Sequence, residues 1–88
     1  PLFGLHLGWG PYLRNVTASG NVIRDAGTGI AVSVVEGAGA AVISDNIISG
    51  ARNGAIRGHR WAEAVTKDLA RVGNAGFAHL TVERNHAS

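Results

Sequence analysis

VTASGNVI, residues 16–23, recurs as AVISDNII at residues 41–48 and as LTVERNHA at residues 80–87. Each copy reads as an apolar residue, any residue, an apolar residue, two small or polar residues and then asparagine. Apolar residues at alternate positions predict a strand. The first two copies are 25 residues apart, and a period between about 20 and 50 residues is typical of a supersecondary unit that stacks on copies of itself. The stretch therefore predicts an all-β fold of stacked strands.

A second short strand is expected after each of three glycines, Gly4, Gly29 and Gly54, which mark the same interval. Residues 5–7 and 30–34 alternate apolar side chains with small or polar ones, which again indicates strands. In the third copy, strict register would turn Arg57 inward. We therefore expect a local shift that buries Ile56 and leaves Arg57 outside, because a slip of one residue reverses every side chain of a strand.

The repeated asparagines are expected at one corner of the stack. Glycine and asparagine near residues 24–28 and 49–53 permit the positive φ that sharp corners need. Stacked side-chain amides can hydrogen-bond along the axis, as amide ladders do in cross-β stacks. Sugar binding is the functional alternative, but the fold alone explains the spacing. The structural ladder is assigned to Asn21, Asn46 and Asn85.

The third interval is longer than the first, 39 residues from Asn46 to Asn85, which places an insertion within residues 59–79. Trp61, Val65, Leu69 and Val72 recur at helical spacing, and a glycine with an asparagine follows at 73–74 as a stop signal. The spacing predicts a short helical insertion near 61–72 that lies against the side of a single segment spanning residues 1–88.

Composition excludes several classes of function. The 88 residues carry eight Lys and Arg against six Asp and Glu, a net charge of only +2, and the basic residues are scattered rather than clustered as nucleic-acid binding requires. No cysteine is present, and no apolar run approaches the roughly 20 residues of a membrane span.

The repeat is already under way at Gly4 and stops in mid-unit at Ser88, so we expect a segment of a longer protein. Its exposed ends would offer unpaired strand edges for self-association.

The order of strand, asparagine corner, apolar residue and glycine-led strand resembles the right-handed parallel β-helix repeat. Pectate-lyase-like enzymes, alginate epimerases and lyases, and many exported bacterial proteins share this repeat. Residues 8–12, 34–37 and 60–61 are most similar to twin-arginine-exported repeat proteins of alphaproteobacteria whose activity is not established. The resemblance implies a β-helix fragment of about three coils, exported to the periplasm or beyond. A leucine-rich repeat is the competing fold, but the alternating β-branched stretch at 29–35 favours a second strand.

Aromatic and basic side chains are the candidates for a carbohydrate site. A sugar can stack on Trp9 or Trp61 while Arg57 or Arg60 binds a carboxylate, and His6 is expected on the same flank. Packing is the simpler interpretation of Trp61, and a solvated loop that of residues 59–60. The binding candidates are Trp9, Tyr12, Arg57, His59, Arg60 and Trp61.

The acidic residues do not form the pair or cluster that an enzyme of acidic polysaccharides needs. Asp25, Asp45 and Glu83 occupy different columns of the repeat, and no nucleophile, phosphate-loop, metal or cofactor motif is present. Asp45 and Arg84 share a column and are expected to form an exposed ion pair. The sequence thus favours a structural or carbohydrate-binding segment. The alternative is part of a polysaccharide lyase or epimerase, in which Arg57, His59, Arg60 and Tyr12 act with residues outside this segment.

Overall fold

The computed structural model describes residues 3–74 and 76–88, and most of its regular structure is β-strand. The described helical segments are two short ones, the 3-10 turn η1 (Gly10–Tyr12) and α1 (Leu69–Val72). The strands are β1 (Phe3–Leu7), β2 (Val16–Ser19), β3 (Val22–Arg24), β4 (Thr28–Ser33), β5 (Ala41–Ser44), β6 (Ile47–Ser49), β7 (Ile56–Arg60), β8 (Glu63–Asp68), β9 (Leu80–Glu83) and β10 (His86–Ala87).

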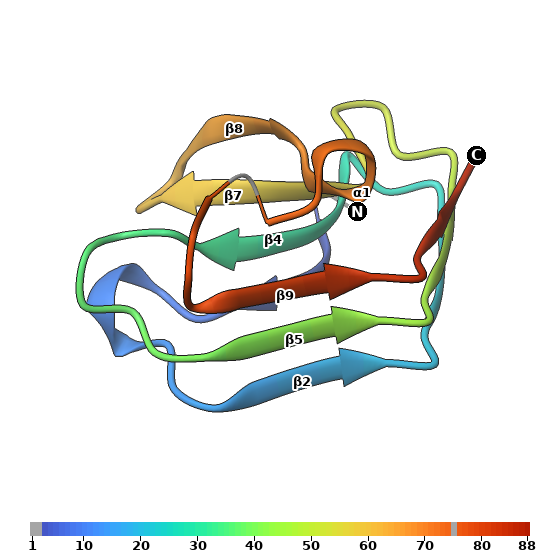
Figure 1. The fold of residues 1–88 in the computed structure, drawn as a ribbon. Coiled ribbons are helices and arrows are strands. Elements are labelled where there is room, and N and C mark those ends of the chain that lie inside the picture. Colours follow the sequence, from blue (N-terminus) through green and yellow to red (C-terminus); the bar gives the residue numbers. More distant parts are fainter. Residues whose placement is uncertain (1–2, 75) are drawn as a thin grey trace.

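The strands form three sheets, ordered β1-β4-β7-β8, β2-β5-β9 and β3-β6-β10. All neighbours pair in parallel except β7 and β8, which are antiparallel. Three successive segments of the chain, 3–24, 28–49 and 56–87, each contribute one parallel strand to every sheet. Figure 1 shows β2, β5 and β9 side by side with their arrows in the same direction.

The register of the sheets follows the sequence repeat. Val16 pairs with Ala41 and Val22 with Ile47, 25 residues on. Between β4 and β7 the offset becomes 26, because Ile30 pairs with Ile56 and Ala31 with Arg57. Strict 25-residue register, which would place Ile56 beside Ala31, therefore fails by one residue, and this is the local shift expected in the third copy. The expected orientation holds, since Ile56 is buried and Arg57 is only half-buried.

Two of the repeated glycines are required by close packing. A Cβ on Gly29 would lie 2.5 Å from the carbonyl oxygen of Ala55 and 2.6 Å from Cγ2 of Ile48. A Cβ on Gly4 would meet Ile23 and the carbonyl oxygen of Gly29 equally closely. Real Cβ atoms do not approach so near, because protein interiors are already close-packed. Glycine thus recurs at this interval because these positions have no room for a side chain between the adjacent strand and an isoleucine of another sheet.

The hydrophobic core lies between the sheets. Each sheet contributes an isoleucine or leucine from alternate positions of its strands, as period-two side chains require. Leu13 and Leu69 close the core from a loop and from α1. The other large core side chains are Ile23, Ile30, Val32, Ile43, Ile48, Ile56 and Leu80.

The helix predicted near 61–72 is wrong over most of its length. Residues 63–68 form β8, which pairs antiparallel with β7, and only Leu69–Val72 are helical. In β8 the exposed residues alternate with half-buried ones, a period of two rather than 3.6. Trp61, Val65 and Val72 are all substantially exposed, and Leu69 alone is buried. The helical spacing of these apolar residues therefore does not mark a buried face.

Asp68 joins the hairpin to the helix. Its carboxylate accepts hydrogen bonds from the backbone N–H groups of Ala55 at 3.0 Å and Ile56 at 3.1 Å, at the start of β7. It also accepts from the N–H of Ala70 at 3.0 Å and so caps α1. N-cap aspartate satisfies helix donors that have no partner within the helix. One side chain thus fixes the first turn of α1 to the beginning of β7.

Candidate functional site

Aromatic rings gather where β1, β7 and the loop before η1 meet. The ring of His6 lies 5.0 Å from that of Phe3 and 5.7 Å from that of Trp9, centroid to centroid. Trp9 in turn lies 5.7 Å from Trp61 in an edge-to-face arrangement, a geometry that aromatic pairs prefer. We call Phe3, His6, Trp9, His59 and Trp61 the aromatic cluster. Its members come from two parts of the sequence, residues 3–9 and 59–61.

The two tryptophans form the exposed part of this cluster. Each is 44% exposed, so both side chains are partly covered by the protein and partly open to solvent. Trp61 packs so closely on Gly10 that a Cβ at that glycine would overlap the indole ring. Trp61 therefore has a packing role, as the sequence suggested, but it acts from a hairpin turn and not from a helix.

The backbone of Trp61 is strained. Trp61 and Ala62 form the two-residue turn between β7 and β8, and Trp61 has a φ of +58°. This left-handed region is usual for glycine or asparagine and unfavourable for a bulky residue. Backbone strain of this kind persists only where the surroundings impose it, and it is concentrated at functional sites.

His59 is the buried member of the cluster and is only 4% exposed. Its ring lies 5.5 Å from that of Phe3 and 6.2 Å from that of His6. Neither ring nitrogen has a hydrogen-bond partner in the structure. Burial lowers the pKa of His59 below its ordinary value, and the positive charges of His6 and Arg57 lower it further, against a weaker opposing effect of the Ala62 backbone. The expected solvated loop at residues 59–60 is therefore wrong for His59, which is buried in β7.

Arg57 does not join the cluster through its guanidinium. Its Nε donates to the carbonyl oxygen of Thr66 at 2.7 Å, and its Nη1 donates to that of Asn53 at 2.6 Å. These bonds hold β7 to β8 and to the loop before β7. Both Arg60 and Tyr12 are exposed, Tyr12 by 75%. Of the predicted binding residues, the structure thus brings together Trp9, His59 and Trp61.

Phe3 is a member of the cluster that the sequence did not indicate. It lies two residues before Leu5 in β1, so the alternation of that strand predicts only another inward side chain. Its contacts with His6 and His59 depend on how β1 and β7 sit across β4, which no local pattern encodes. His6 was expected on this flank, and its ring lies near those of Trp9 and His59.

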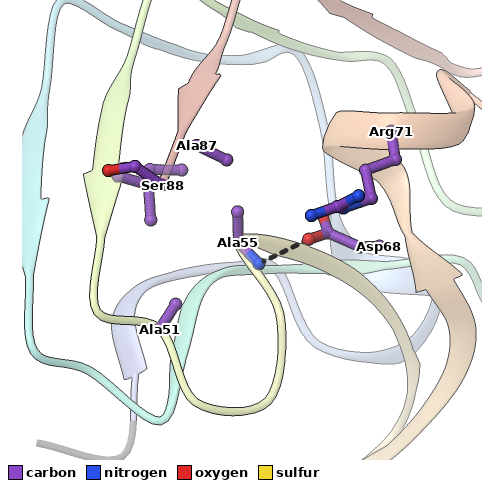
Figure 2. A pocket seen from close by; sticks show the side chains of 7 residues that line it. Ala51, Ala55, Asp68, Arg71, Ala87 and Ser88 are labelled. Atoms are coloured by element: carbon purple, nitrogen blue, oxygen red, sulfur yellow. Dashed lines mark hydrogen bonds between the residues drawn. The ribbon is translucent and has the colours of Figure 1, made fainter.

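A separate pocket of about 210 Å³ lies at the other end of β7, lined by Ile48, Ala51, Ala55, Asp68, Arg71, Ala87 and Ser88. Figure 2 shows Ala87 and Ser88 on one side of it and Asp68 and Arg71 on the other, with the hydrogen bond from Ala55 to Asp68 along its wall. Because Asp68 already accepts three backbone hydrogen bonds, its carboxylate is used in holding α1 and β7.

Comparisons with protein-family models, with curated proteins and with solved structures found no match. Within residues 3–74 and 76–88, no group of three or more His, Cys, Asp or Glu side chains is placed to hold a metal ion. No helix in this part of the chain is long and apolar enough to cross a membrane.

Proposed function

We propose that this chain is a segment of a right-handed parallel β-helix, from an exported bacterial protein, that binds carbohydrate at Trp9 and Trp61. The fold part of the proposal is supported by the parallel strand pairs present in every sheet, with β7–β8 as the antiparallel exception, and by the 25-residue register. It is also supported by the asparagines at equivalent corners, whose amides hydrogen-bond from one segment to the next. Handedness and export rest on the sequence resemblance.

The observation that carries the binding role is the pairing of two half-exposed indoles from distant parts of the chain. Trp9 and Trp61 are 52 residues apart in sequence and 5.7 Å apart in space. A single exposed apolar side chain is normal on a protein surface, but adjacent exposed apolar side chains are a feature of interaction sites. Edge-to-face rings leave two apolar faces at an angle, on which the C–H face of a sugar ring can stack. Aromatic walls with a few polar groups are usual in ligand sites.

Exposed residues close in sequence to the two tryptophans are the proposed polar groups. Arg60 immediately precedes Trp61 and is exposed, so its guanidinium is free to move toward a bound ligand. Arginine binds carboxylates with two parallel hydrogen bonds, which suits an acidic sugar. Tyr12 ends η1 and carries a phenolic hydroxyl that can donate or accept. These two residues are the proposed determinants of sugar type.

Binding is better supported than the enzymatic alternative. A lyase or epimerase would use Arg57, His59, Arg60 and Tyr12 together, but Arg57 is engaged by two carbonyl groups and both nitrogens of His59 are enclosed. A proton-transfer group must reach the proton that it moves. The described geometry gives neither residue that access.

The test is binding to a panel of soluble glycans, including a neutral β-glucan oligosaccharide and an oligogalacturonate, by calorimetry. We expect Trp9→Ala to weaken binding at least tenfold. Trp61→Phe retains an aromatic ring on Gly10 and should weaken binding less than Trp61→Ala. Arg60→Gln should weaken binding of the oligogalacturonate alone. Val22→Ala is the matched control, because Val22 is 67% exposed but lies in a different sheet.

Two outcomes would contradict the proposal. One is that no glycan of the panel binds the wild-type protein at millimolar concentration. The other is that Trp9→Ala binds as tightly as Val22→Ala, with circular dichroism showing both variants folded.

A further inference from the structure

His59 is a buried polar side chain whose two ring nitrogens have no hydrogen-bond partner among residues 3–74 and 76–88. Both ring nitrogens are inaccessible to solvent and unbonded in the structure, although most buried polar groups in folded proteins are hydrogen-bonded. An unsatisfied buried group of this kind costs about 1–3 kcal/mol. The neutral imidazole is tolerated because it packs as an aromatic ring against Phe3 and His6. The charged imidazolium would be compensated in the same place only by the weaker effect of the Ala62 backbone.

The elements around His59 provide no carboxylate in contact with it. On β1 the titratable neighbour is His6, and β4 contributes no titratable residue. On β7 the charged groups are Arg57 and Arg60. On β8, Glu63 is exposed opposite Arg60 in the register, Lys67 is exposed, and Asp68 bonds the amides of β7 and α1. A proton on His59 would therefore meet positive neighbours and little water.

We propose that His59 is a pH-sensitive latch that holds the β7–β8 turn and Trp61 against β1 and Trp9 when neutral, and releases them when protonated. Two features favour opening here: Trp9 and Trp61 are already partly exposed, and Trp61 has a strained backbone. Release would allow Trp61 to leave the left-handed region and would let water reach the imidazolium. The latch is independent of whether the tryptophans bind a sugar.

The direction of the pH effect follows from linkage. An open state exposes His59 and restores its ordinary pKa near 6.5, whereas the closed state lowers that pKa. The open state therefore binds the proton more tightly. As the pH falls below about 6.5, the ratio of closed to open molecules decreases by up to tenfold per pH unit, until the lowered pKa of the closed state is reached.

The test follows tryptophan fluorescence of the whole chain from pH 8 to pH 4, together with the His59 Hε1 resonance in NMR spectra. We expect a change of Trp emission below pH 6.5 that coincides with the titration of His59, while far-ultraviolet circular dichroism keeps its β-sheet signal. His59→Phe retains an aromatic ring without a proton and should abolish the change. His59→Gln is the second non-titrating variant. His86→Phe is the control, because His86 is exposed in a different sheet.

His6→Ala should move the opening transition to lower pH or weaken it, because removing a positive neighbour makes protonated His59 less costly in the closed state. The proposal is overturned if the wild-type protein shows no transition above pH 4, or if the emission change persists in His59→Phe and His59→Gln. It is equally overturned if the His59 resonance titrates without any change in tryptophan emission.

Discussion

Asn46 Oδ1 accepts two hydrogen bonds from Asn21, one from its backbone N–H and one from its side-chain amide, both at 3.0 Å. Asn46 repeats the same pair of contacts with Asn85 Oδ1, at 3.2 and 2.8 Å. The amide of Asn46 also donates to the carbonyl oxygen of Ala18, and that of Asn85 to Ile43. The three asparagines thus satisfy one another and the backbone at the corner between two sheets.

Asn46→Ala should destabilise the protein more than Asn21→Ala does. Asn46 is fully buried and lies between two partners, whereas Asn21 is only half-buried at the end of the series. Loss of Asn46 leaves several buried donors and acceptors unpaired, at about 1–3 kcal/mol each before relaxation. We expect a decrease of about 2–4 kcal/mol in the free energy of unfolding, measured by urea denaturation. Equal effects of the two variants would show that the contacts along the series contribute little.

Gly29→Ala tests the close packing behind the repeated glycines. The added Cβ would overlap a backbone carbonyl that cannot move without shifting β7. Overpacking of this kind costs about 1–3 kcal/mol. The control is Gly20→Asn, at a corner with φ +68° and nothing near the added Cβ. Asp45 adopts this conformation at the equivalent corner, and asparagine tolerates it. A control that unfolds as easily as Gly29→Ala would argue against a steric cause.

The stacked contacts of Asn21, Asn46 and Asn85 were predictable because they depend only on a fixed interval in the sequence. The exposed pair of Asp45 and Arg84 follows from the same columns, and Arg84 Nε lies 2.9 Å from Asp45 Oδ1. In a stack of repeats each segment lies beside the equivalent segment of the next copy, so the spacing in the sequence sets which residues become neighbours.

The region around residues 61–68 was not predictable from the same kind of pattern. Trp61, Val65, Leu69 and Val72 satisfy a helical spacing, but the choice between helix and hairpin is made by what the segment packs against. Two hydrogen bonds of Thr66 stabilise the hairpin. Its Oγ1 accepts a hydrogen bond from the N–H of Gly58 at 2.8 Å, and its carbonyl oxygen accepts one from Nε of Arg57. Gly58 permits this approach, because a Cβ there would lie 2.7 Å from Thr66 Cγ2.

The candidate site was predictable in its residue types and not in its assembly. The tryptophans and nearby basic residues were candidates for a sugar site from the sequence alone, but Arg57 has its own backbone partners. The burial of His59 depends on contacts with Phe3, 56 residues away in the chain. Contacts at such distances are set by tertiary packing, which overrides local preference.

Asp68→Ala should loosen the join between β7 and α1. Its carboxylate serves three backbone N–H groups, those of Ala55, Ile56 and Ala70. Removal of the cap alone costs about 0.5–2 kcal/mol, and the two unpaired strand amides add to this. We expect faster hydrogen exchange at Ala55, Ile56 and Ala70 in NMR spectra. Lys67→Ala is the control, because Lys67 is exposed beside Asp68. Unchanged exchange at Ala55 and Ile56 would contradict the role.

Asp45 offers a test of the exposed pair by titration. The hydrogen bond from Arg84 lowers the pKa of Asp45 below its ordinary value of 3.8, and the charge of Arg84 acts in the same direction. A carboxyl with a lowered pKa contributes stability that is present above its ordinary pKa and is lost as the pH falls through the lowered one. The Asp45 carboxyl carbon should therefore titrate below pH 3.8 in NMR spectra. In Arg84→Gln the pKa of Asp45 should return toward 3.8. The free energy of unfolding at neutral pH should change little, because both side chains of the pair are exposed. Raising the salt concentration should move the wild-type value in the same direction by screening the pair. An Asp45 titration that is the same in Arg84→Gln and in wild type would contradict the role of Arg84 and leave the Ser44 side chain as the cause.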